Sequence, residues 1–293
     1  MRSISISSRK YNNLEVYRTT DVNTEGVIYE FPYKGKVKLL KKLYINDGIS
    51  FVRKLFTIGV LGSCELPSYF VVPDSLVTIK NEIVGFTIPR INGVTLKSLL
   101  DDNGVSLDVK ISYLKSVGSI LENMVNIREY TDLNDFYLND MHESNFMVNY
   151  DTNELCVIDL DGCKVNKSFS FPSRYLTSKA LLNNVNKYDV QSDLSKGAYV
   201  MANRDSDLYC YVIMILNFLY DSNINAIDIG EFYNYLNYLS SIGVNGNLLN
   251  CFNRIVSYGP NYNPMEYLDS LNSDIICRAK KIVFDTVMKK KHL

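Results

Sequence analysis

Two clusters of oxygen-bearing side chains flank a segment that is expected to fold as a β-hairpin. Asp140 and Asn145 precede residues 146–158, and Asp159 and Asp161 follow them. Within that segment an Asn- and Asp-rich turn separates two apolar runs, a pattern typical of a hairpin. A hairpin returns the chain to the end where it began, so the two clusters are expected to meet. Carboxylate and amide oxygens are the ligands that Mg²⁺ prefers, and the sequence therefore predicts a magnesium site here.

Each of these side chains has an expected part in that site. Asn145 and Asp159 are the expected metal ligands, with phosphate oxygens in the remaining positions. Asp161 is either a second metal ligand or an acceptor that supports a ligand. Asp140 opens the loop and can take a proton from a hydroxyl group or orient it, which with a metal ion is the equipment for phosphoryl transfer. The alternative, turns stabilised by Asn and Asp around a structural hairpin, explains the joint spacing less well.

Length and composition limit the classes of protein. The chain has 293 residues, of which 46% are hydrophobic, and this suits one large domain or two lobes with a sizeable core. The formal net charge of −1 gives no reason to expect a nucleic-acid or membrane partner. Residues 1–10 lack the apolar core of a signal peptide, and the longest apolar stretch, 209–220, is too short to span a bilayer. Six cysteines without a CxxC pair and only two histidines predict free thiols and no zinc site. We expect a cytoplasmic protein.

The first third of the chain is rich in β-strand signals. One helix is expected at 49–61, because its apolar positions have the spacing of a helix that lies against a sheet. The expected strands, separated by turn residues, are 27–29, 37–40, 76–79 and 83–88.

The remainder is predicted to be mainly helical. A short helix is expected at 96–100, and a long one follows with Ser106 or Asp108 as its N-cap. Another strongly apolar helix is expected to begin at Asp207, after roughly forty residues without a clear period, a length that usually marks a functional segment. The predicted class is therefore α+β, with a β-rich part at 1–89 and a helical part at 90–293.

The order Asp140-x-x-x-x-Asn145, hairpin, Asp159-x-Asp161-Gly162 resembles the catalytic and metal-binding loops of the protein-kinase-like superfamily. That superfamily includes protein kinases and the aminoglycoside and choline phosphotransferases. The resemblance extends from about residue 23 to residue 219 and implies a two-lobed fold, with a small β-rich N-lobe that contains one helix and a larger, mainly helical C-lobe. It also implies ATP and Mg²⁺ as cofactors.

The resemblance assigns roles to individual residues. Asp140 would act on the acceptor hydroxyl, Asp207 would brace the catalytic loop, and His142 stands where many small-molecule kinases have His. The residues implied to contact the nucleotide are Lys38 at the phosphates, Gly26 as the remnant of a glycine-rich loop, and Phe86, Thr87 and Ile88 at the adenine through their backbone.

The choice of lysine depends on strand alternation. Alternation places Lys36 and Lys38 on one face of the strand and Lys41 on the other. Lys38 is preferred as the phosphate-binding residue because apolar residues flank it. Lys41 is the alternative.

Two departures from the family pattern favour a second hypothesis. The glycine-rich loop is reduced to Gly26, and the helix at 50–61 has no acid, although active protein kinases carry a Glu there that pairs with the strand lysine. These departures point to a pseudokinase that serves as a binding or regulatory module.

The first hypothesis is a phosphotransferase that acts on a protein Ser/Thr or a small-molecule hydroxyl, and nucleotidyl transfer is a third, smaller option. The segment with Ser168, Ser170, Ser173 and Thr177 leaves room for an activation segment.

Overall fold

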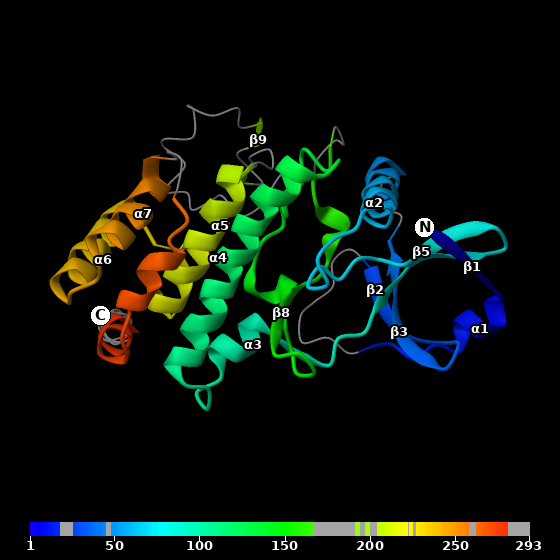
Figure 1. Cartoon of the computed structure of the whole chain (residues 1–293), viewed down its shortest axis with the longest axis horizontal. Helices are drawn as coiled ribbons and strands as arrows, with labels where there is room; N and C mark the ends of the chain where they lie inside the picture. Colours follow the sequence, from blue (N-terminus) through cyan, green and yellow to red (C-terminus); the bar gives the residue numbers. More distant parts are fainter. Residues whose placement is uncertain are drawn as a thin grey trace.

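A five-stranded sheet forms the N-terminal part of the molecule (Figure 1). The computed structural model describes residues 1–17, 26–44, 48–166, 191–193, 197–199, 204–221, 223–224, 227–257 and 262–280. In spatial order the strands of this sheet are β1 (Arg2–Ile6), β4 (Ser75–Ile79), β5 (Glu82–Pro89), β3 (Lys36–Leu43) and β2 (Gly26–Tyr33). β1 runs parallel to β4, and the other neighbours are antiparallel. The four strands that the sequence predicts are confirmed, and β1 is an addition to them.

Tight turns set the register of the antiparallel strands. Lys34 and Gly35 have φ of 49° and 76° between β2 and β3, and Lys80 and Asn81 have φ of 50° and 68° between β4 and β5. Positive φ at both central residues matches the right-handed twist of the paired strands. These two hairpins therefore determine which side chains of β3 and β5 share a face.

Each face of the sheet is covered by a helix. Helix α1 (Ser8–Asn12) lies on the side where Phe31 and Leu40 pack against β1. Helix α2 (Gly48–Leu61) lies on the other side, where its Ile58 packs against Leu43 and Phe86. The sequence predicts α2 almost to its ends but not α1, so the expectation of one helix in this part is corrected to two. Helix α1 has five residues and no buried side chain, which left little periodicity to detect.

A small second sheet follows the connection at residues 90–92. Its strands are β6 (Gly93–Thr95), β7 (Phe146–Asn149) and β8 (Glu154–Val157), all antiparallel. The predicted hairpin is thereby confirmed, with Phe146 opposite Val157. β6 is too short to be recognised from its sequence.

The C-terminal part is helical (Figure 1). Its α-helices include α3 (Leu96–Asp101), α4 (Leu107–Tyr130), α5 (Arg204–Tyr220), α6 (Ile229–Ser241) and α7 (Gly246–Ser257). Ser106 is the N-cap of α4, since its side chain accepts a hydrogen bond from the backbone N–H of Val109. At the crossing of α4 and α5 the buried Tyr211 hydroxyl donates to the Leu114 carbonyl oxygen over 2.7 Å.

The architecture is α+β, with a β-rich N-terminal sheet and a helical C-terminal part. Helix α5 begins three residues before Asp207, where the sequence predicts its start. Most of the aperiodic segment, with Ser168, Ser170, Ser173 and Thr177, lies outside the described residues, although β9 (Gln191–Asp193) and β10 (Gly197–Tyr199) pair within it. No helix in the described ranges has the length and apolar character needed to cross a membrane.

Candidate functional site

Helix α5 supports the loop that carries Asp140. The Asp207 carboxylate accepts hydrogen bonds from the backbone N–H groups of Leu138, at 2.9 Å, and Asn139, at 3.1 Å. Burial raises the pKa of Asp207 to about 6, and these two donors oppose that shift. The expected bracing contact between Asp207 and the loop is therefore confirmed.

Two polar residues of the site have left-handed backbone conformations. Asn139 has φ of 63° and Asp159 has φ of 61°. For residues other than glycine this conformation costs on the order of 1 kcal/mol and persists only where the surroundings impose it. The Asn139 side chain is part of those surroundings, since its amide nitrogen donates to the Gly162 carbonyl oxygen over 3.1 Å. Asn139 thus joins the loop of Asp140 to the loop of Asp159, a link that the sequence did not predict because it joins residues far apart in the chain.

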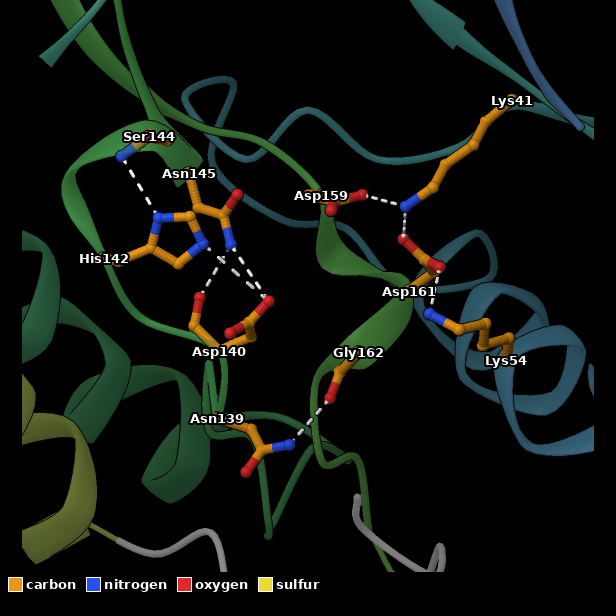
Figure 2. A network of polar contacts seen from close by, with 10 residues as sticks. All are labelled: Lys41, Lys54, Asn139, Asp140, His142, Ser144, Asn145, Asp159, Asp161 and Gly162. Atoms are coloured by element: carbon orange, nitrogen blue, oxygen red, sulfur yellow. Dashed lines mark hydrogen bonds and ion pairs between the residues drawn. The ribbon is translucent and has the colours of Figure 1, made fainter. Parts of the chain in front are cut away.

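The Asp140 carboxylate is about half exposed and lies beside Asn145 and His142 (Figure 2). The Asn145 amide nitrogen donates to the Asp140 carbonyl oxygen over 2.7 Å, which turns the amide oxygen of Asn145 away from that loop. His142 Nδ1 accepts from the Ser144 backbone N–H at 3.3 Å, and its Nε2 lies 3.9 Å from Asp140 Oδ2. Asp140 therefore remains accessible to a substrate, while the side chains around it are held.

The hairpin brings Asn145 and Asp159 to the same end. The Ile158 backbone N–H donates to the Asn145 carbonyl oxygen over 2.9 Å, so Asp159 follows directly after the residue opposite Asn145. One amide oxygen and one carboxylate are a donor set that suits Mg²⁺ when phosphate oxygens complete its coordination. Within the described part of the chain, no three His, Cys, Asp or Glu side chains gather in a way that would hold a metal by themselves.

The lysine at this site is Lys41 (Figure 2). Its ammonium group pairs with the Asp159 carboxylate and lies 2.8 Å from Asp161 Oδ1. Only 5% of the Lys41 side chain is exposed. Burial disfavours its charged form, but the two carboxylates outweigh that effect and raise the pKa of Lys41 above its ordinary value.

Lys38, which the sequence favoured, lies elsewhere. Its ammonium group pairs with Asp74, whose other carboxylate oxygen accepts a hydrogen bond from the Thr87 hydroxyl. Lys38 shares the face of the sheet with Leu40, which packs toward β1, whereas Lys41 is paired with Phe86 on the face toward α2. The choice of Lys38 as the phosphate-binding residue stays a prediction that this placement does not favour, because apolar neighbours along the chain do not reveal which face meets the acidic loop.

The Asp161 carboxylate accepts hydrogen bonds from two lysines. Besides Lys41, the Lys54 ammonium group of α2 lies 2.6 Å from Asp161 Oδ2. The Asp161 side chain is 1% exposed, and burial alone would raise its pKa, but Lys41 and Lys54 outweigh burial and hold that pKa well below its usual range. Nearby, burial raises the pKa of Asp159 against the attraction of Lys41. With both oxygens engaged by lysines, Asp161 is arranged as a partner for cations of the protein rather than as a metal ligand.

Lys54 was not identified from the sequence. A signal was present, since Lys54 lies four residues before Ile58 and seven before Leu61, on the stripe of α2 that is buried. A basic side chain on a buried stripe requires an anionic partner. That partner, Asp161, is supplied by a segment more than one hundred residues away.

The remaining residues expected at the nucleotide have structural contacts. A Cβ on Gly26 would overlap the Lys42 carbonyl oxygen, so close strand pairing accounts for this glycine. The Phe86 side chain is buried against Leu43 and Ile58. Phe86 and Thr87 are paired with β3 on one side and β4 on the other, and the Thr87 carbonyl oxygen accepts from the Asp74 N–H at 2.9 Å.

The pairing of Phe86 and Thr87 with β3 and β4 bears on the adenine contact that is expected from their backbone. In the described sheets Ile88 is paired with β3 but not with β4, and the chain leaves the sheet after Pro89. The backbone of Phe86 and Thr87 is therefore engaged within the sheet. Residues 90–92 form the link between the two parts of the molecule.

No protein-family model matches this chain, and no curated protein matches it either. The resemblance to the protein-kinase-like superfamily therefore stays a prediction from the sequence motifs.

Proposed function

We propose that the protein is an ATP- and Mg²⁺-dependent phosphotransferase with a two-lobed, protein-kinase-like architecture. The observation that carries the proposal is the convergence of Asp140, Asn145 and Asp159, from the helical part, with Lys41 from the sheet. A base, two hard oxygen ligands and a cation in one place are the parts that phosphoryl transfer requires.

The phosphate-binding role passes from Lys38 to Lys41 in this proposal. The Lys41 ammonium group adjoins Asp159, so phosphates on a metal held by Asn145 and Asp159 would lie within its reach. A bound Mg²⁺ would supply charge that offsets the phosphate oxygens. Lys41 adds a second positive charge in a poorly solvated position, where electrostatic stabilisation is strongest.

Asp140 acts on the acceptor. Its carboxylate is exposed enough to reach a hydroxyl group, orients the hydroxyl and takes its proton. The acceptor oxygen bonds to the γ-phosphorus, the bond from that phosphorus to the β–γ bridging oxygen breaks, and ADP leaves. The acceptor is a protein Ser/Thr or a small-molecule hydroxyl.

Binding and turnover of Mg-ATP test the proposal. Binding is measured by calorimetry, and turnover by transfer of label from γ-labelled ATP to the protein itself or to water. Asp140→Asn should retain Mg-ATP binding and lose about 10²–10⁴-fold in turnover, the usual contribution of a general base. Asp159→Ala should weaken Mg-dependent binding, and unchanged binding and turnover in that variant would disprove the metal assignment.

A pseudokinase is the second candidate, and two observations favour it. Lys41 is already paired with Asp159, its proposed neighbour in metal binding, and the close packing of Gly26 against Lys42 gives that glycine a structural reason. This candidate expects little thermal shift with Mg-ATP and no phosphoryl transfer. Robust ATP turnover that is lost in Asp140→Asn would exclude it.

A further inference from the structure

Asp161 lies between two lysines from different elements of the molecule (Figure 2). Its Oδ1 atom is 2.8 Å from the Lys41 ammonium nitrogen of β3, and its Oδ2 atom is 2.6 Å from the Lys54 ammonium nitrogen of α2. The two lysine side chains are 5% and 9% exposed, so both ion pairs are shielded from water. Asp161 thus links the strand, the helix and the loop that carries Asp159.

This arrangement inverts the charges expected for the helix. The resemblance implies a Glu on α2 that pairs with the strand lysine, but no residue of Gly48–Leu61 is acidic. The carboxylate that pairs with Lys41 instead comes from the loop, at Asp161, and α2 contributes Lys54. The helix is therefore attached to the site through its positive charge.

We propose that Asp161 is a positioning residue that holds Lys41 for the phosphates of ATP, in place of the absent helix carboxylate, and that Lys54 holds Asp161. The inference rests on the proposed function, because it assigns Lys41 to the phosphates. Asp161 itself does not touch the substrate, since both its oxygens are engaged.

Asp161 and Lys54 are both needed because Asp159, the proposed metal ligand, competes with Asp161 for the Lys41 ammonium group. Without Asp161 the Lys41 ammonium group would keep its ion pair with Asp159, the residue assigned to the metal. A carboxylate held through both oxygens has a fixed plane, and charge-assisted hydrogen bonds of this kind are directional. Lys54 therefore orients Asp161 so that Asp161 competes with Asp159 for the Lys41 ammonium group.

Variants that keep the net charge of this cluster can distinguish the positioning of Lys41 from simple electrostatic attraction of ATP. Lys41, Lys54, Asp159 and Asp161 together sum to zero. The double variant Lys54→Met/Asp161→Asn removes one charge of each sign, so these four residues stay neutral in sum and Lys41 keeps its ion pair with Asp159. The matched control is Lys38→Met/Asp74→Asn, which removes the other ion pair of β3.

The test measures displacement of a fluorescent ATP analogue by Mg-ATP and by adenosine. Positioning predicts that the double variant binds Mg-ATP about 10- to 100-fold more weakly, the loss typical of a hydrogen bond to a charged group, with unchanged adenosine binding. The control variant should bind both ligands as the wild type does. Equal loss of Mg-ATP and adenosine in the double variant would show a merely structural role and overturn the inference, as would wild-type binding of both.

The single variants provide a second discrimination. Attraction by charge alone predicts tighter Mg-ATP binding in Asp161→Asn and weaker binding in Lys54→Met, since the two change the net charge in opposite directions. Positioning predicts weaker binding in both, and opposite signs would overturn it. If the wild type binds no Mg-ATP, the proposed function fails and the inference fails with it. If the wild type binds and the double variant is unaffected, only the inference fails.

Discussion

Lys38 and Lys41, two lysines of β3 that pair with aspartates, differ in their position and in what their removal would cost. Lys38 and Asp74 form a pair on the opposite face of the sheet from Lys41, with side chains 23% and 34% exposed. Lys41 is almost fully buried and pairs with Asp159 and Asp161. An ion pair in contact with water contributes about 0–1 kcal/mol, whereas removal of one partner of a buried pair leaves a charge without compensation.

The difference teaches that residue type and local sequence do not identify the lysine that lies beside Asp159 and Asp161. Both lysines are on the same strand, and both have a carboxylate within reach. Only the face that turns toward α2 and the loop of Asp159 brings a lysine to the site. The comparison can be tested by variants of each pair and of the contacts that define β3.

The largest effect is expected for Lys41→Met. The variant should lose about 10²–10³-fold in turnover, since it removes a cation from a poorly solvated phosphate site. Its free energy of unfolding should fall by about 3 kcal/mol, because Asp159 loses its ammonium partner and Asp161 keeps only Lys54. Turnover with labelled ATP and urea unfolding check the two parts. If Lys41→Met loses no more turnover and no more stability than Lys38→Met, the proposed difference between the two lysines is wrong.

Two buried carboxylates, Asp207 and Asp161, should respond to pH in opposite directions. The pKa of Asp207 rises from 3.8 to about 6 on folding, so the folded state binds more protons in that range and the contribution of Asp207 to stability is lost as pH rises. The stability of the wild type relative to Asp207→Asn should therefore fall by up to about 3 kcal/mol between roughly pH 4 and pH 7. Denaturant unfolding at several pH values measures this slope.

Asp161 provides the contrast for that experiment. Its pKa is lowered on folding, so its contribution to stability is present above the ordinary value of 3.8 and is lost as pH falls below it. A difference between wild type and Asp207→Asn that does not change between pH 4 and pH 7 would contradict the shift at Asp207. The Asp207→Asn variant also loses a hydrogen-bond acceptor for the loop, but this changes the free energy of unfolding by the same amount at every pH.

A smaller effect is expected for Gly26→Ala, which tests the register that separates the two lysines. The new methyl group would overlap the Lys42 carbonyl oxygen, so β2 must shift against β3. We expect the free energy of unfolding to fall by about 1–3 kcal/mol, as for other overpacked positions. Thermal unfolding measures it. Weaker Mg-ATP binding at unchanged stability would instead assign Gly26 to the phosphates.

The smallest effect is expected for Lys38→Met. Asp74 keeps the Thr87 hydroxyl as a partner and remains in contact with water, so stability should change by less than about 1 kcal/mol. Mg-ATP binding should be unchanged within the error of calorimetry. A loss of binding comparable with that of Lys41→Met would restore Lys38 to the phosphate site.

Much of the local structure was predictable because it depends on nearby residues. The turns at Lys34 and at Asn81, the Ser106 cap and the hairpin that aligns Asn145 with Asp159 all follow from local turn and capping chemistry. Short elements such as β1, α1 and β6 were missed, since their stability comes from pairing with distant strands or packing against them.

The sequence by itself determined the residue types and spacings of Asp140, Asn145 and Asp159, together with the hairpin between them. Only the tertiary structure decided that Lys41 rather than Lys38 lies at this site, and that Lys54 and Asp161 form an ion pair. The physical reason is that a side chain's partners depend on which face of a strand or helix turns inward. That orientation is set by packing between segments far apart in the chain, which a local pattern does not contain.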